Sequence, residues 1–73
     1  SINEAVLGIS NKDSLHHINE AFKDSQETEY WLRLLYKTNY LSEKEFKSIY
    51  NDCIELIKML SSIIESSKDK PLL

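Results

Sequence analysis

The stretch Lys37-Thr38-Asn39-Tyr40-Leu41-Ser42-Glu43-Lys44-Glu45-Phe46 decides the fold of this 73-residue chain. Asn39 is a residue type that tolerates the left-handed conformation of a helix C-cap when glycine is absent. Ser42 and Glu45 have the spacing of a capping box, which satisfies free amides at the start of a helix. The sequence therefore predicts two helices, at residues 11–38 and 43–66. The short turn between them predicts an antiparallel hairpin.

The composition of the chain supports long helices and excludes several classes of protein. One Gly and one Pro in 73 residues leave little to interrupt a helix. The mass of 8.5 kDa allows one small domain, residues 1–73, and no apolar run reaches the roughly 20 residues of a membrane span. A net charge of −3 gives no general attraction for nucleic acid. The single Cys excludes an internal disulfide and a cysteine-rich zinc site, and indicates a cytoplasmic location.

Both predicted helices carry more apolar surface than one partner helix needs. Each has a seam of apolar or small residues at alternating spacings of three and four. The seams are Ile18, Ala21, Ser25, Thr28, Leu32 and Leu35 in the first helix and Phe46, Ile49, Cys53, Leu56, Leu60 and Ile63 in the second. Further apolar residues flank both seams, and residues 27–35 have large side chains on every side. We therefore expect residues 27–35 to be buried by several neighbours, supplied by other parts of the chain, by other subunits, or by both.

Few residues suggest chemistry. Glu20, Asp24 and Glu27 lie along one helical face with His17 nearby, but the Glu-x-x-His element of a metal-binding bundle is absent. A solvated acidic face is the simpler interpretation, and no metal or other cofactor is expected. Cys53 lies on the apolar seam, where a cysteine usually packs as a small hydrophobe. No base is placed to activate it, so the sequence predicts no catalytic residue.

Basic residues cluster weakly at the turn end of the hairpin. Nucleic-acid binding requires grouped cations. The candidate contacts are Arg33, Lys37, Lys44 and Lys47. Two glutamates in the same place weaken the patch.

Three segments together resemble a known family. These are Glu27-Thr28-x-Tyr30-Trp31-Leu32-x-Leu34-Leu35, the turn at residues 39–42 and the apolar run at residues 57–64. They resemble the C-terminal part of the four-helix-bundle proteins first noticed as products of intervening sequences within bacterial 23S ribosomal RNA genes. Residues 2–5 and 10–13 are similar to the end of that family's second helix and the following loop. The chain departs from the pattern where Asn39 replaces the usual Gly, and where the first helix and most of the second would precede residue 1.

The resemblance implies an all-α, up-down four-helix bundle that assembles into a homopentamer without enzymatic activity. It also implies an N-terminally truncated domain, with a helix end at residues 1–9 and a tail at residues 67–73. A relative in diversity-generating retroelements serves a reverse transcriptase and binds nucleic acid, so RNA is a candidate partner. Trp31 is expected to be a packing anchor and Glu27 a hydrogen-bond partner. The expected packing or interface residues are Glu27, Trp31, Leu32, Leu35, Tyr50, Ile57, Leu60 and Ile64.

Two hypotheses follow from the sequence. The first is a non-enzymatic, oligomeric four-helix-bundle protein that acts as a scaffold or as a nucleic-acid-associated accessory. The alternative is a helical interaction module that completes a bundle with a different protein.

Overall fold

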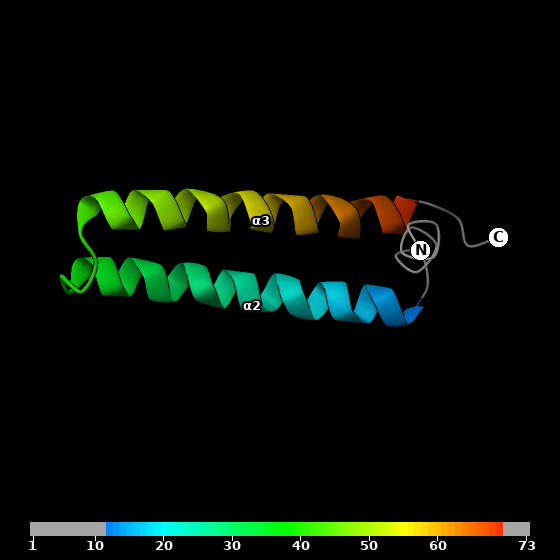
Figure 1. The fold of residues 1–73 in the computed structure, drawn as a ribbon. Helices are drawn as coiled ribbons and strands as arrows, with labels where there is room; N and C mark the ends of the chain where they lie inside the picture. Colours follow the sequence, from blue (N-terminus) through cyan, green and yellow to red (C-terminus); the bar gives the residue numbers. More distant parts are fainter. Residues whose placement is uncertain (1–11, 70–73) are drawn as a thin grey trace, which may run out of the picture.

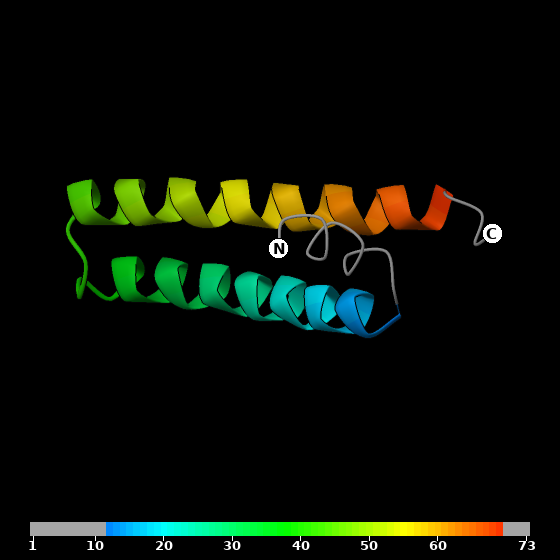
Figure 2. The same ribbon diagram turned by 45° about the vertical axis from the view of Figure 1, so that its right-hand side comes forward.

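The protein forms a hairpin of two long helices. A computed structural model describes residues 12–69, and within this range there is no β-strand. Helix α2 spans Lys12–Lys37 and helix α3 spans Glu43–Asp69. The two helices lie side by side along their length and are joined at one end by residues 38–42, as Figures 1 and 2 show from two directions. The expected all-α hairpin is therefore confirmed.

The end of α2 is a Schellman motif. Asn39 has a positive φ of 68°, which confirms the predicted left-handed cap. The backbone N–H of Tyr40 donates to the carbonyl of Leu35 at 2.8 Å, and that of Asn39 donates to the carbonyl of Tyr36 at 3.1 Å. These two bonds satisfy carbonyls that the last turn of a helix leaves free, and they reverse the chain direction.

The start of α3 is the predicted capping box. The backbone N–H of Glu45 donates to Ser42 Oγ at 3.1 Å, and the backbone N–H of Ser42 donates to Glu45 Oε1 at 2.9 Å. The bond that the Ser42 backbone N–H donates, and next the interaction with the Ser42 hydroxyl, lower the pKa of the Glu45 carboxyl. Both ends of the connection are therefore fixed by bonds between residues close in sequence.

The helix limits differ in part from those expected. Helix α2 ends at Lys37, not Thr38, because the left-handed cap at Asn39 places Thr38 in the turn. Helix α3 continues to Asp69 instead of ending at Ser66. No helix-breaking residue occurs before Pro71, and Ser67 Oγ donates to the carbonyl of Ile64 within the last turns. The helix start at residue 11, the helix end expected at residues 1–9 and residues 70–73 of the expected tail lie outside the described range.

The contact between the helices is narrow. Leu32 and Cys53 are each 8% exposed, and Ser25 is 6% exposed. Small residues at positions 25 and 53 let the helices approach closely. The sequence predicted this close approach at Ser25. Nearer the turn, the ring of Phe46 stacks between Tyr36 and Tyr50, with centroids 4.3 and 4.8 Å apart. Aromatic stacking closes one end of the interface, while small side chains fill its middle.

Much of the apolar surface remains exposed. The neighbours expected to bury residues 27–35 are not supplied by the hairpin alone, in which Trp31 is 48% exposed. The physical reason is that, among the described residues, α2 packs against one helix, α3, which covers one side of it. The large apolar side chains left exposed in the described part of the chain are Tyr30, Trp31, Leu34, Leu35, Tyr40, Ile49, Leu56 and Met59.

Candidate functional site

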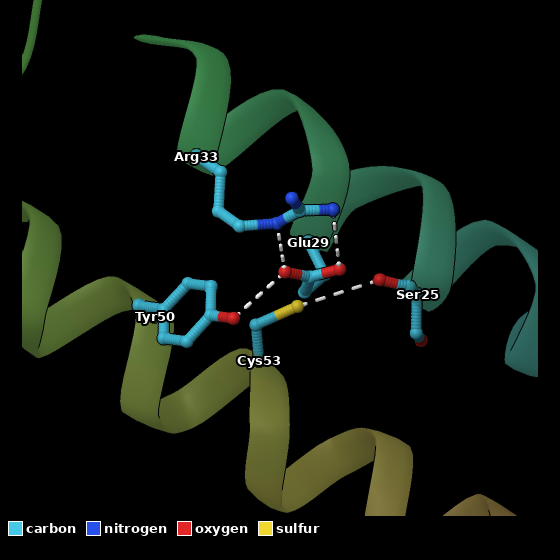
Figure 3. A network of polar contacts seen from close by, with 5 residues as sticks. All are labelled: Ser25, Glu29, Arg33, Tyr50 and Cys53. Carbon is cyan, nitrogen blue, oxygen red and sulfur yellow. Dashed lines mark hydrogen bonds and ion pairs between the residues drawn. The ribbon is translucent and has the colours of Figure 1, made fainter. Parts of the chain in front are cut away.

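A polar network joins the two helices beside their narrow contact. Arg33 donates from Nε and Nη2 to the carboxylate of Glu29, one turn earlier on α2. The hydroxyl of Tyr50, on α3, donates to Oε2 of the same carboxylate at 2.7 Å. Figure 3 shows Glu29 between Arg33 on one side and Tyr50 on the other. One carboxylate thus receives donors from both helices and fixes their relative position.

The network changes the proton affinity of its members. The hydrogen bonds from Arg33, and next from Tyr50, lower the pKa of Glu29. The bond to Glu29, followed by partial burial, raises the pKa of the Tyr50 hydroxyl. Glu29 likewise raises the pKa of Arg33. All three effects favour a charged Glu29–Arg33 pair with a neutral tyrosine at physiological pH.

The buried thiol of Cys53 belongs to the helix contact. Cys53 Sγ donates to the backbone carbonyl of Ser25 at 3.4 Å (Figure 3). Ser25 Oγ in turn donates to the carbonyl of Ala21 at 2.8 Å. Burial, followed by the negative charge of Glu29, raises the pKa of the Cys53 thiol. A thiol held protonated is a poor nucleophile, so the geometry suits the predicted packing role.

An open groove runs between the helices on the side away from the Glu29 network. Its volume is about 300 Å³. Leu32, Ile49, Leu56 and Cys53 provide most of its apolar lining. The residues that line the groove are Asp24, Ser25, Thr28, Leu32, Ile49, Asp52, Cys53 and Leu56. The lining of the groove is therefore mainly apolar, and each helix contributes one aspartate to it.

A second apolar surface lies on the outside of α2. Tyr30 and Leu34 are each about 200° around the helix from buried Leu32, so they point away from α3. The rings of Tyr30 and Trp31 pack edge to face, with centroids 5.2 Å apart. Trp31 Nε1 also lies 3.5 Å from Glu27 Oε1, at the long limit of a hydrogen bond. We call Tyr30, Trp31 and Leu34 the outer aromatic surface.

The four basic residues proposed for nucleic-acid contacts lie near the turn, but they are not equivalent. Arg33 is bound to Glu29, and its guanidinium also lies 5.9 Å from the ring centroid of Tyr30. Lys47 Nζ is 3.2 Å from Glu43 Oε1. Lys37 and Lys44 have no acidic partner among the described residues. Two of the four cations are therefore already neutralised by neighbouring carboxylates.

The remaining predicted residues are spread along the hairpin. Leu32 is buried in the helix contact, and Leu35 is exposed on α2. Tyr50, Ile57, Leu60 and Ile64 are half-buried along α3. The structure thus gathers part of the predicted set on the helix contact and leaves Trp31 and Leu35 exposed on α2.

The acidic residues considered for a metal site do not form one. His16 Nε2 lies 2.9 Å from Glu20 Oε1, and His17 Nδ1 lies 3.9 Å from the same oxygen. Within residues 12–68, no three His, Cys, Asp or Glu side chains come together as metal ligands would. In the same range neither helix has a stretch long and apolar enough to cross a membrane.

Sequence reasoning placed Tyr50 among the packing residues, but it missed the bond between Tyr50 and Glu29. That bond joins residues 21 positions apart. Its presence depends on how far α3 is shifted along α2, which no local pattern reports. The available signal was a tyrosine on the flank of one seam and a glutamate on the flank of the other.

Comparison with protein families gives one match. The family described as 23S rRNA-intervening sequence protein matches residues 1–62 of the chain. Searches among curated proteins and among solved structures found no match. The match covers the whole of α2, the turn and most of α3.

Proposed function

The chain belongs to the 23S rRNA-intervening sequence protein family, and we propose that it is a non-enzymatic scaffold built by association of helices. The observation that carries the proposal is the apolar surface of the hairpin. Among the described residues, eight large hydrophobic side chains are at least 37% exposed, whereas two hydrophobic residues are buried. Exposed apolar surface of this extent is typical of a protein that binds other helices. In the proposed assembly, the hairpin supplies two helices of an up-down four-helix bundle.

We place self-association at the outer aromatic surface. Tyr30 and Trp31 are both about half exposed, and aromatic side chains are enriched at protein interfaces. Their edge-to-face packing and the contact of Trp31 with Glu27 limit the conformations of both rings before association. Less conformational entropy is then lost on binding. The resemblance implies five copies, and the buried free thiol of Cys53 is compatible with the reducing cytoplasm, where we place the protein.

Sedimentation velocity tests the assembly. We expect a species whose mass is a multiple of 8.5 kDa, five times that mass if the resemblance holds in this respect. The double variant Tyr30→Ser/Trp31→Ser should shift the protein toward monomer. Tyr40→Ser is the matched control, because Tyr40 is the most exposed aromatic residue and lies at the turn. A wild-type chain that stays monomeric at every concentration would contradict the scaffold proposal.

A nucleic-acid-associated role is the second candidate. The observation that favours it is that Lys37 and Lys44 lie at the same end of the hairpin without acidic partners among the described residues. Two free cations from adjacent helix ends can contact neighbouring phosphates. Arg33 and Lys47 contribute less, because Glu29 and Glu43 hold them.

Binding to a structured RNA at low and moderate salt tests this role. We expect affinity to fall as salt rises, because phosphate contacts release counterions. Lys37→Gln/Lys44→Gln should weaken binding, whereas the control Lys23→Gln/Lys58→Gln removes the same charge elsewhere and should not. No RNA binding at low salt, or an equal loss in both variants, would exclude a specific role for the turn end.

A further inference from the structure

Tyr40 exposes its ring at the turn of the hairpin. It is 79% exposed, the highest value among the large hydrophobic side chains of the described residues. It belongs to residues 38–42, which lie at one end of the hairpin, between the last turn of α2 and the first turn of α3 (Figure 1). The next side chain, that of Leu41, is half-buried. The turn therefore covers one of two neighbouring large side chains and leaves the aromatic one free.

The backbone holds this ring in a fixed place. The N–H of Tyr40 donates to the carbonyl of Leu35 at 2.8 Å, and the N–H of Leu41 donates to the same carbonyl at 3.3 Å. Asn39, immediately before Tyr40, has the left-handed conformation of the helix cap. A tyrosine side chain has two rotatable angles, so little conformational entropy is lost when its ring binds a flat partner. The exposed ring is therefore pre-organised for contact.

The two carboxylates at the start of α3 are engaged within the hairpin. Glu43 Oε1 lies 3.2 Å from Nζ of Lys47. Glu45 Oε1 accepts the backbone N–H of Ser42 at 2.9 Å in the capping box. Both negative charges interact with groups of the hairpin itself, which reduces their repulsion of an anion at the turn.

Two lysines flank the exposed ring in the chain. Lys37 precedes Tyr40 by three residues and Lys44 follows it by four. Since an extended chain spans at most about 3.6 Å per residue, the Cα atoms of the two lysines lie within about 11 Å and about 14 Å of that of Tyr40. Neither lysine has an acidic partner among the described residues. The turn end therefore combines one aromatic face with two available cations, a combination typical of sites for single-stranded nucleic acid.

We propose that the turn end binds an unpaired stretch of RNA, with one base stacked on Tyr40 and adjacent phosphates on Lys37 and Lys44. Bases in a duplex stack on one another, and an aromatic side chain reaches their faces where the strand is unpaired. This contact tolerates any base, because every base has a flat π-face. The inference rests on the proposed nucleic-acid-associated role and names the kind of RNA structure that the turn end recognises.

Fluorescence anisotropy with the full chain tests the proposal. The probes are a labelled 12-nucleotide oligouridylate and a labelled 12-base-pair RNA duplex. We expect the single strand to bind at least about fivefold tighter than the duplex, the smaller value for one stacked base. Tyr40→Ala should weaken binding of the single strand by about 5- to 150-fold. Tyr40→Phe is the matched control, because it keeps the ring and should leave the affinity within about twofold.

The salt dependence separates stacking from charge. For a single strand, each phosphate contact contributes about 0.7 to the slope of log affinity against log salt concentration. Lys37→Gln/Lys44→Gln should therefore reduce this slope by about 1.4. Tyr40→Ala should leave the slope unchanged, because it removes an aromatic ring and no positive charge.

Thermal unfolding shows whether the ring of Tyr40 is free in the folded protein. Tyr40→Ala should melt within about 4 °C of the wild type, because the side chain is exposed. Tyr36→Ala, which removes a ring stacked on Phe46, should lower the melting temperature further. An equal fall in the two variants would show that Tyr40 is packed inside the protein, and it would overturn the proposal.

Three other results would also overturn the proposal. The first is equal affinity for the single strand and the duplex. The second is unchanged affinity in Tyr40→Ala when Lys37→Gln/Lys44→Gln binds more weakly, in which case phosphate contacts alone hold the RNA and the nucleic-acid-associated role stands. The third is a shift of Tyr40→Ser toward monomer in sedimentation velocity, which would mean that a second copy covers the ring. No binding of either RNA at low salt would remove the nucleic-acid-associated role together with this inference.

Discussion

The turn end of the hairpin and its middle are built in different ways. At the turn, the bonds of the helix caps connect residues that are at most six positions apart, and the aromatic stack of Tyr36, Phe46 and Tyr50 covers the adjoining interface. In the middle, the contacts depend on residues far apart in sequence. Cys53 bonds to Ser25, and Tyr50 bonds to Glu29.

This difference separates reversal of the chain from association of helices. The turn end satisfies its own hydrogen bonds and needs nothing further to reverse the chain. The middle is held by small buried residues and one polar network, and beside them it leaves an apolar groove with two aspartates. Short side chains bring the helices close together but cannot cover the surfaces on either side of the contact. We infer that the turn end specifies the hairpin, whereas the middle leaves apolar surface for other helices to cover.

Leu32→Ala should have the largest effect, because it acts on the middle, where few residues are buried. We expect a loss of about 2–4 kcal/mol in the free energy of unfolding, the usual cost of removing a buried leucine. Gln26→Ala is the control, since Gln26 is exposed on the same helix. Urea denaturation followed by circular dichroism measures both. Equal losses would mean that the contact with α3 contributes no more than the outer surface.

Asn39→Val should be next, because it tests the turn end. A β-branched residue at a φ of 68° is strained, and we expect a cost of about 1–2 kcal/mol. Asn39→Gly should be neutral or slightly stabilising, because glycine adopts this conformation freely. Thermal unfolding of the two variants provides the measurement. If the glycine variant lost more than about 1 kcal/mol, the side chain of Asn39 would have a role that the cap does not explain.

Ser42→Ala should cost about 1 kcal/mol, the typical value for a lost N-cap. It removes the acceptor for the Glu45 N–H and leaves Glu45 bound only to the backbone of Ser42. Ser48→Ala, within α3 and exposed, should be neutral or slightly stabilising because alanine favours helix. Chemical denaturation distinguishes the two. A neutral Ser42→Ala would show that the aromatic stack alone holds this end.

The polar network should have the smallest effect, and it should depend on pH. The pKa of Glu29 is lowered below its ordinary value of 4.5, so its contribution is present above that pH and is lost as the pH falls through the lowered value. The pKa of Tyr50 is raised above its ordinary value of 10.0, so its contribution is present below that pH and is lost as the pH rises through the raised value.

Tyr50→Phe tests the loss of stability at both acid and alkaline pH. It should remove the alkaline loss of stability. The acid loss should become smaller but remain, because Arg33 still bonds to Glu29. Melting temperatures measured from acid to alkaline pH give the comparison, with Tyr40→Phe as the control at an exposed tyrosine. If the loss of stability at alkaline pH were unchanged in Tyr50→Phe, that loss would come from other groups.

The residues that sequence analysis placed correctly are those whose partners are close in the chain. Asn39, Ser42 and Glu45 were predicted because caps follow rules that depend on a few neighbouring positions. Trp31 was expected to be buried, because its segment is apolar on every side, yet the hairpin leaves it half exposed. A pattern of apolar residues reports that a surface must be covered, but it does not report which neighbour covers it.

The sequence by itself therefore determined the two helices, the turn between them and the excess of apolar surface. These depend on side-chain periodicity and on capping bonds that span a few residues. Only the tertiary structure decided that Tyr50 reaches Glu29, that Cys53 meets Ser25, and that Asp24 and Asp52 share one groove. The physical reason is the register of α3 along α2. That register follows from packing of the whole interface, and a shift of one turn would change all these partners while keeping every local rule.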